Sequence, residues 1–321
     1  MKQKIQKKIE KNIPTIGQAW EWYYDEKVAQ GIADMTLQTY YYAYKAYLNY
    51  YGFDPAETPI TEMTQATMYK WMNHMRNEEL SDYSIRHYIG NIRSFLNWCM
   101  DDTRNYIEPY KIKMAKPQEA KLKVYTDDEL YALLVRPSNS STFVEWRTWA
   151  IVNFILGTGA RAGTVVSLRV EDINFKNKEI YYRHLKNKKA QTVPLSSGLE
   201  NVLREYIKMW RDNPESYLFP NVGDEPLRVE ALHAAYARYC KNRDVEQTNV
   251  HALRHSFARE WVRNNGNIFA LQRILGHSAL DMTRRYVALF GEDLKRDYES
   301  FSALDTLKKN TRRKQTVKKS F

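Results

Sequence analysis

Residues 168–195 read LRVEDINFKNKEIYYRHLKNKKAQTVPL, and this stretch departs from the helical pattern of the rest of the chain. Three short runs within it (LRVEDINF, KEIYYRHL and AQTVPL) are rich in β-branched or aromatic residues and are separated by Asn and Lys. Runs of this length and composition are typical of strands joined by turns. The stretch therefore predicts a small antiparallel sheet inside a mainly α-helical protein.

Helical patterns are expected on both sides of this sheet. Before it, TDDEL has the form of a capping box, with Thr126 and Glu129 as the paired residues that open a helix. A second helix is expected around VEWRTWAIVNFILGTGA. After the sheet, helices are expected from about residue 197, in NVLREYIKMW, VEALHAAYARYC, HALRHSFAREWVRN, IFALQRIL and a stretch through Tyr286.

The N-terminal region predicts a separate helical unit. In TLQTYYYAYKAYLNYYGF, apolar and aromatic positions recur three and four residues apart, which indicates the buried face of a helix that stops at Gly52. Most of the many aromatic residues here are therefore expected in the core. A second helix lies in SIRHYIGNIRSFLNWCM, where Arg86 and Arg93 share one polar face because they are seven residues apart.

Changes in composition divide the chain into segments. Residues 105–125 contain prolines and lysines without a helical period, which favours an extended basic linker. We therefore expect a helical domain at residues 13–104, the linker, a second domain at residues 126–307 that contains the sheet, and a basic tail at residues 308–321. The tail shows no apolar periodicity, and we expect it to be either mobile or ordered only on a partner.

Composition narrows the class of protein. The chain has 321 residues and 49 − 38 = 11 more basic than acidic residues, so its surface should attract polyanions, nucleic acid before acidic membranes. Its two cysteines lie far apart without metal-site spacing, which favours a reducing, cytoplasmic location. No segment approaches the roughly 18 apolar residues of a membrane span. Neither secretion nor membrane insertion is expected.

Two clusters of His, Arg and Tyr carry the candidate chemistry. In HALRHSFA, His251 and His255 are four residues apart and resemble a metal-binding pair, but the Glu of the HExxH motif is absent and Arg254 would place a cation beside the metal. A guanidinium and an imidazole are instead suited to binding phosphate and moving a proton. The second cluster, LGHSALDMTRRYVAL, adds His277 and Tyr286. A tyrosine is a nucleophile at neutral pH only beside cations and a base.

These boxes resemble those of the tyrosine recombinases, the lambda-integrase family. TGARAGTVVSLRVEDI is similar to the first box, LKNKKAQTVPL to the hairpin that carries the family lysine, HALRHSFA to the His-x-x-Arg box, and LGHSALDMTRRY to the last. The helical region before the linker resembles the core-binding domain of the family more loosely. The resemblance implies a two-domain DNA clamp and six catalytic residues, Arg161, Lys186, His251, Arg254, His277 and Tyr286.

The sequence departs from the family pattern at two places. Thr164 stands where the family commonly has an acidic residue that steadies the site, so support must come from elsewhere. The hairpin reads Leu-Lys-Asn rather than Gly-Lys-Gly, which leaves Lys188 or Lys189 as alternatives to Lys186.

The resemblance implies a reaction and its partners. Tyr286 would attack a scissile phosphate of double-stranded DNA, two arginines would stabilise the charge, and His251 would accept the phenol proton. Lys186 would protonate the leaving 5′-oxygen, and no metal or other cofactor would be needed. Arg86 and Arg93 are expected to contact DNA. Strand exchange implies a homotetramer on DNA, with an accessory DNA-bending or directionality protein as a further partner.

The sequence leaves the biological role open. A site-specific recombinase or integrase of a phage or another mobile element is the expected function. A type IB topoisomerase uses a similar residue set to relax DNA without exchanging strands, and a non-catalytic DNA-binding accessory factor would keep the fold alone. Both stay as alternatives at this stage.

Overall fold

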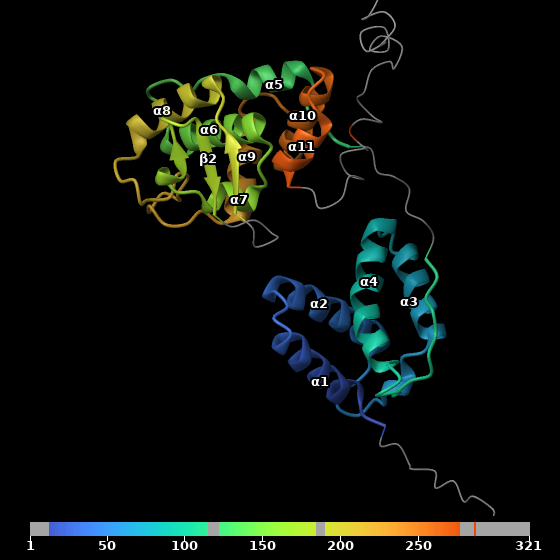
Figure 1. Cartoon of the computed structure of the whole chain (residues 1–321). Coiled ribbons are helices and arrows are strands. Elements are labelled where there is room, and N and C mark those ends of the chain that lie inside the picture. The colour runs from blue at the N-terminus through green and yellow to red at the C-terminus, as the bar shows by residue number, and fades with distance from the viewer. Residues whose placement is uncertain (1–12, 115–121, 184–189, 277–285, 287–321) are drawn as a thin grey trace, which may run out of the picture. The chain divides into compact units, whose positions relative to one another are not determined.

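The computed structural model describes residues 13–114, 122–183, 190–276 and 286. The chain forms two compact units, residues 1–120 and residues 121–321 (Figure 1). Within the described ranges both units are mainly helical, and the second contains a small antiparallel sheet, as the sequence predicts. None of the helices in these ranges is long and apolar enough to cross a membrane.

The described part of the first unit contains four α-helices, and the N-termini of three of them are capped by local side chains. Thr15 and Thr64 form capping boxes and Ser81 caps a third helix, while Gly52 ends the second in the left-handed conformation, at φ 66°. The predicted stop at Gly52 is confirmed. The elements are α1 (Ile16–Ala29), α2 (Asp34–Tyr51), the short 3₁₀ helix η1 (Ile60–Glu62), α3 (Gln65–Asn77) and α4 (Asp82–Cys99).

The core of the first unit gathers around α4, which packs against α1, α2 and α3. The predicted apolar face of α4 is fully buried, and Tyr44 and Tyr47 of α2 are buried with it. Trp20 of α1 stacks on Tyr44 with ring centroids 4.0 Å apart. Other aromatic residues of the same region are exposed, among them Trp22 and Tyr42. The aromatic residues at helical spacing are therefore core residues, but aromatic residues between them are not.

Part of the segment expected as a linker packs along the first unit. Ile107 and Ile112 are buried in its core, and the Tyr110 hydroxyl donates to the carbonyl of Met63 at 2.6 Å. Tyr125 belongs to the second unit, where it is buried and its N–H donates to the Ser256 hydroxyl at 3.0 Å.

The second unit surrounds a central helix, α6. This helix is buried on nearly all sides and packs against α5, α8, α9 and α10 (Figure 1). The predicted capping box of Thr126 and Glu129 is present at the start of α5. The helices are α5 (Asp127–Leu134), α6 (Phe143–Thr158), α7 (Ala162–Ser167), the 3₁₀ helix η2 (Val170–Asp172), α8 (Ser197–Trp210), α9 (Val229–Lys241), α10 (Val250–Arg263) and α11 (Ile268–Leu275).

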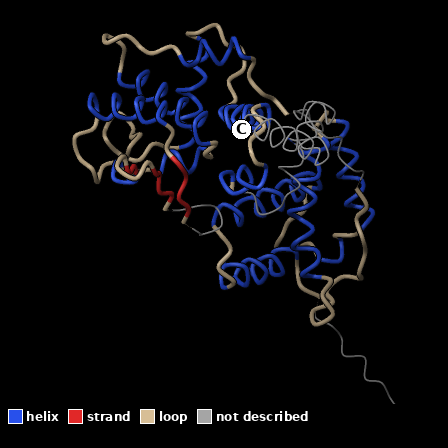
Figure 2. Tube along the Cα trace, turned by 45° about the horizontal axis from the view of Figure 1, so that its top comes forward, coloured by secondary structure: helices blue, strands red, loops and turns tan. Residues whose placement is uncertain are grey.

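The sheet has three strands in the order β1-β2-β3, and both neighbouring pairs are antiparallel (Figure 2). The strands are β1 (Ile173–Asn174), β2 (Glu179–Tyr182) and β3 (Gln191–Pro194). Ile180 of β2 faces Ile173 on one side and Val193 on the other, and all three side chains are buried in the core. This alternation of buried and exposed residues holds the register.

Candidate active site

The first predicted arginine follows the end of α6. Gly159 ends that helix in the left-handed conformation, and Arg161 is the N-cap residue of α7, with extended backbone angles. Its side chain is half-buried, and this burial lowers the pKa of its guanidinium, while Tyr286 acts in the opposite direction. Arginine stays charged at neutral pH in proteins, so Arg161 supplies a partly desolvated cation.

Arg254 lies on α10 and is almost completely buried, with 3% of its surface exposed. Its Nη1 donates to the carbonyl of Gly159 at 2.6 Å and its Nη2 to the carbonyl of Leu275 at 2.8 Å. Burial, and then the charge of Arg161, lowers the pKa of Arg254 to about 10, which keeps it protonated at neutral pH. The guanidinium therefore ties α10 to the ends of α6 and α11 and holds a fixed positive charge there.

Tyr286 lies in the same part of the second unit as Arg161 and Arg254. Its side chain is 1% exposed and packs with Leu271 and Leu275 of α11. A tyrosinate at this position would raise the pKa of both Arg161 and Arg254, which places the phenol within electrostatic reach of both guanidinium groups. With His251, which interacts electrostatically with Arg161 and Arg254, the structure brings together the four predicted catalytic residues that it describes.

His251 lies one turn of α10 before His255 and is exposed. Partial desolvation, followed by the charges of Arg254, Arg161 and His233, lowers the pKa of its imidazole. The ring is therefore neutral at neutral pH, the form that can accept a proton.

His255 contacts the predicted nucleophile. Its Nδ1 lies 2.6 Å from the Tyr286 hydroxyl, and its ring is in T-shaped contact with His251, with centroids 4.6 Å apart. Sequence reasoning considered this histidine only as a metal ligand. The sequence feature that could have identified it is its spacing from His251, because residues four apart share one helix face.

Lys186 and His277 lie outside the described residues, as do Lys188 and Lys189. The described segments that flank them are linked to each other. The Gln191 side chain on β3 donates to the carbonyl of Arg273 on α11 at 2.6 Å. Strand β3 follows Lys186 in the chain, and α11 comes just before His277. The hydrogen bond therefore connects the two described segments from which these predicted residues extend.

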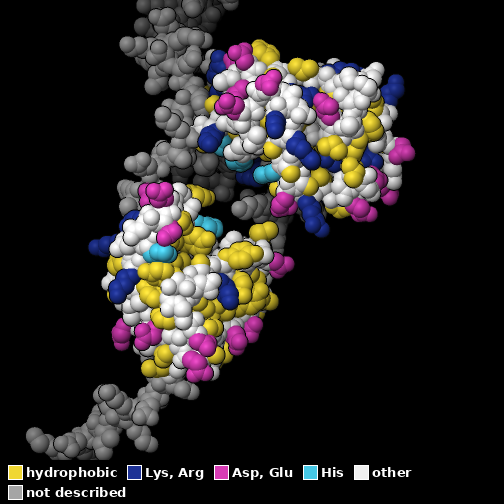
Figure 3. Space-filling view, turned by 180° about the vertical axis from the view of Figure 1, so that it is seen from behind, with side chains coloured by type: hydrophobic (Ala, Val, Ile, Leu, Met, Phe, Trp, Pro, Cys, Tyr) yellow, Lys and Arg dark blue, Asp and Glu magenta, His cyan; other side chains and the backbone are white. Residues whose placement is uncertain are grey.

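Thr164 lies next to the predicted site, three residues after Arg161, whereas Arg86 and Arg93 lie in the first unit. Thr164 is buried on α7, and its carbonyl accepts a bond from the Ser167 hydroxyl at 2.9 Å. Arg86 and Arg93 are on α4 in the first unit, where Arg93 is exposed and Arg86 is partly buried. They belong to a different compact unit from the arginine–tyrosine cluster. Figure 3 shows Lys and Arg side chains at the surface of both units.

The described ranges contain no group of three or more His, Cys, Asp or Glu side chains that could hold a metal ion. Cys99 and Cys240 are both buried and form no disulfide. Burial raises the pKa of both thiols, which keeps them protonated and unreactive.

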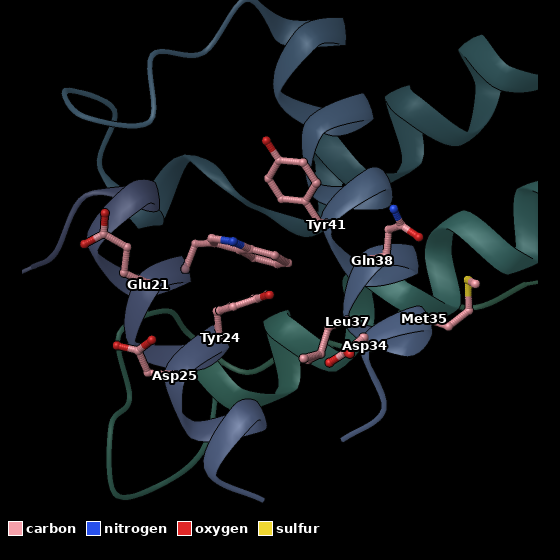
Figure 4. A pocket seen from close by; sticks show the side chains of 9 residues that line it. Glu21, Tyr24, Asp25, Asp34, Met35, Leu37, Gln38 and Tyr41 are labelled. Atoms are coloured by element: carbon pink, nitrogen blue, oxygen red, sulfur yellow. The ribbon is translucent and has the colours of Figure 1, made fainter. Parts of the chain in front are cut away.

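A pocket of about 790 Å³ lies between α1 and α2 in the first unit, whereas Arg161, Arg254 and Tyr286 belong to the second unit (Figure 4). It combines aromatic side chains with the carboxylates of Glu21, Asp25 and Asp34. Carboxylates repel phosphate, so the pocket does not suit the chemistry of the arginine–tyrosine cluster.

Gly159 offers a test of how the backbone positions Arg254. Its φ is 66°, and a Cβ there would lie 2.5 Å from Phe257 and 2.7 Å from Leu275. We expect Gly159→Ala to destabilise the protein by about 1–3 kcal/mol, because a non-glycine residue is strained in this conformation. Cleavage activity should fall as well, since the Gly159 carbonyl that holds Arg254 must shift. Urea unfolding and a cleavage assay measure the two effects.

Gly163→Ala is the matched control. Gly163 is in α7, and nothing lies within 4 Å of the Cβ it would gain. Ala in a helix is favoured over Gly, so this variant should unfold at the same or a higher urea concentration. Equal stability losses in the two variants would contradict the role given to Gly159.

Comparison with known proteins gives a family. The family model described as Phage integrase family matches residues 123–292, more than half of the chain, which confirms the resemblance seen in the sequence. The tyrosine recombinase XerD of Halalkalibacterium halodurans is 24% identical over 81% of this chain and 89% of its own length.

Solved structures give the same fold. A lambda integrase tetramer bound to a Holliday junction matches with a TM-score of 0.70 and 17% identity, covering 88% of this chain and 80% of the integrase chain. The Tn1549 transposon integrase in complex with transposon right end DNA matches with a TM-score of 0.68 and 17% identity, covering 90% of this chain and 100% of that chain.

Proposed function

Because this chain belongs to the Phage integrase family, we propose that it is a tyrosine-type site-specific DNA recombinase that cuts and rejoins DNA through a 3′-phosphotyrosyl intermediate. One observation carries the proposal. The Tyr286 phenol lies within electrostatic reach of Arg161 and Arg254 and at hydrogen-bonding distance from a histidine. A nucleophile, fixed cations and a base are the groups that phosphoryl transfer to a tyrosine needs.

The two arginines stabilise the transition state. When Tyr286 attacks the scissile phosphorus, negative charge grows on the non-bridging oxygens, and a guanidinium offers paired donors that match them. Arg254 is held by two backbone carbonyls, so its position is fixed before the DNA arrives. Such preorganised charge is commonly the largest single contribution to catalysis.

The other proposed residues move protons or bind phosphate. Lys186 protonates the 5′-oxygen as it leaves, and His277 hydrogen-bonds the phosphate. His251 is exposed, and its lowered pKa leaves it neutral, which suits the role of proton acceptor implied by the family. The phosphodiester energy is kept in the covalent intermediate, so the reaction needs no metal and no other cofactor.

Double-stranded DNA is the proposed partner. The excess of 11 positive charges supplies the sequence-independent part of affinity, and Arg86 and Arg93 contribute contacts from α4. We propose a homotetramer in the synaptic complex, supported by the fold shared with the lambda integrase tetramer. The basic tail at residues 308–321 lies outside the described residues, and its contact with DNA or with a neighbouring protomer stays a prediction.

A mobile genetic element is the proposed source of the activity, in line with the fold shared with the Tn1549 transposon integrase. The enzyme would act in the cytoplasm, where its DNA substrate lies. A DNA-bending or directionality protein would be an accessory to integration or excision rather than to the chemical step.

Trapping on a nicked suicide substrate tests the proposed function. Loss of the short 5′-hydroxyl strand prevents religation, so a recombinase accumulates as a covalent adduct on DNA that carries its own site. Candidate sites come from the DNA that flanks the gene. A type IB topoisomerase would instead relax any plasmid without site preference, and an accessory factor would bind DNA without forming an adduct. Either result would overturn the proposal.

Lys186 is tested through the leaving group, because a general acid matters only when the departing oxygen is basic. We expect Lys186→Ala to cleave ordinary DNA about 10²–10⁴-fold more slowly than wild type. It should cleave DNA that carries a 5′-phosphorothiolate at nearly the wild-type rate. Single-turnover cleavage on the two substrates measures this. Rescue in Lys188→Ala or Lys189→Ala, with normal cleavage of ordinary DNA by Lys186→Ala, would move the role to the other lysine.

A further inference from the structure

The contact between His255 and Tyr286 is not explained by the six catalytic residues that the family resemblance implies. The two residues are 31 positions apart in the chain, yet His255 Nδ1 and Tyr286 Oη are separated by 2.6 Å. Both side chains are buried, with 8% and 1% of their surfaces exposed. This distance suits a hydrogen bond in which the phenol donates to the neutral imidazole. The structure thus pairs the proposed nucleophile with a titratable base.

His251 occupies a different position on the same helix face. It is exposed and lies against the His255 ring rather than at the phenol oxygen. Among the described residues, the histidine nitrogen within hydrogen-bonding distance of Tyr286 belongs to His255. The geometry therefore separates two histidines that the spacing of the sequence leaves equivalent.

The surrounding charges favour loss of the phenol proton. A tyrosine with a pKa of about 10 is mostly protonated at neutral pH and needs a base. Arg161 on α7 and Arg254 on α10 interact electrostatically with Tyr286, so a tyrosinate formed there would be stabilised. Among the described residues, the charged and titratable groups that interact with this pair include the two guanidinium cations and His251, and His233 of α9 interacts electrostatically with His251.

We propose that His255 is a catalytic residue, which orients the Tyr286 hydroxyl and accepts its proton during DNA cleavage. As the bond from Tyr286 Oη to phosphorus forms, the phenol proton passes to His255 Nδ1. The bond from phosphorus to the 5′-oxygen breaks, and that oxygen leaves with a proton from the general acid. On religation the proton returns from His255 to Tyr286. This rests on the proposed function and moves the role of proton acceptor from His251 to His255.

The pH dependence of cleavage tests the proposal, with His255→Asn and His251→Asn as the matched pair. Asparagine keeps a hydrogen-bonding group near the position of Nδ1 but does not titrate. We expect His255→Asn to cleave about 10²–10⁴-fold more slowly at pH 7. Its rate should then keep rising by about tenfold per pH unit through the alkaline range, because hydroxide replaces the base. Wild type should level off at lower pH. His251→Asn, whose overall rate falls if His251 contributes to catalysis, should still level off in the same way.

Two results would overturn the proposal. If His255→Asn lowers the rate by the same factor at every pH, the histidine has only a structural role. If His251→Asn shows the alkaline rise and His255→Asn levels off like wild type, His251 is the base. Circular dichroism checks the fold of each variant, and His255→Gln is measured in the same way if His255→Asn does not fold.

A second readout needs no DNA, which separates this inference from the proposed function. With 3-fluorotyrosine placed at position 286, the ¹⁹F resonance of wild type and of His251→Asn should show, besides the ionisation of the phenol itself, a second pH-dependent step that His255→Asn lacks and that couples the phenol to the His255 ring. A coupled resonance without any DNA adduct would leave the pairing standing and overturn the recombinase function. Adducts on DNA without a coupled resonance would overturn the role of His255 alone.

Discussion

Tyr286→Phe should form no covalent adduct with DNA, while its affinity for a recombination site stays close to that of wild type. The substitution removes one oxygen, the atom that would bond to phosphorus. Arg161 and Arg254, the groups proposed to hold the phosphate, should keep their positions because the Phe ring fills the same buried space between α10 and α11. Denaturing gels detect the adduct and gel shifts measure binding.

Tyr298→Phe is the control for this experiment, since Tyr298 is another tyrosine in the C-terminal part of the chain. It should form adducts at the wild-type level. An adduct that survives in Tyr286→Phe and disappears in Tyr298→Phe would assign the nucleophile to Tyr298. A loss of site binding in Tyr286→Phe would show that the phenol mainly recognises DNA.

Arg254→Ala is expected to slow cleavage by about 10²–10³-fold, the range found when one preorganised donor is removed from a transition state. It should also destabilise the fold, because the carbonyls of Gly159 and Leu275 lose a charged donor in a buried place. Each unsatisfied buried group costs about 1–3 kcal/mol. Single-turnover cleavage and urea unfolding separate the chemical effect from the structural one.

Arg147→Ala is the matched control, because Arg147 is also buried and donates to a backbone carbonyl, that of Pro220. It lies within α6 rather than at the tyrosine. The variant should lose stability, but its folded fraction should cleave DNA at the wild-type rate. If folded Arg254→Ala cleaves DNA at the wild-type rate, the Arg254 guanidinium stabilises the fold but does not contribute to catalysis.

Local patterns in the sequence were sufficient for most of the fold. The capping box of Thr126 and Glu129 and the stop at Gly52 involve residues within one helical turn, so they could be recognised without tertiary information. The strands could be predicted for a similar reason, because alternation of buried and exposed residues is a property of each strand. The apolar spacing of α4 likewise predicted its buried face.

Contacts between distant segments could not be predicted in this way. The pairing of His255 with Tyr286 and the two carbonyls that hold Arg254 depend on how α6, α10 and α11 meet. The packing of Ile107 and Ile112 on the first unit also depends on tertiary structure, because this segment has no helical period of its own. The sequence motif identified the residue types of the site but not their hydrogen-bond partners.

The most direct test of the central claim is the chemical identity of the bond between protein and DNA. The trapped complex is digested with a protease and a nuclease, and the cross-linked peptide is sequenced by mass spectrometry. We predict a nucleotide joined through its 3′-phosphate to Tyr286. Attachment to another residue, or through a 5′-phosphate, would contradict the account.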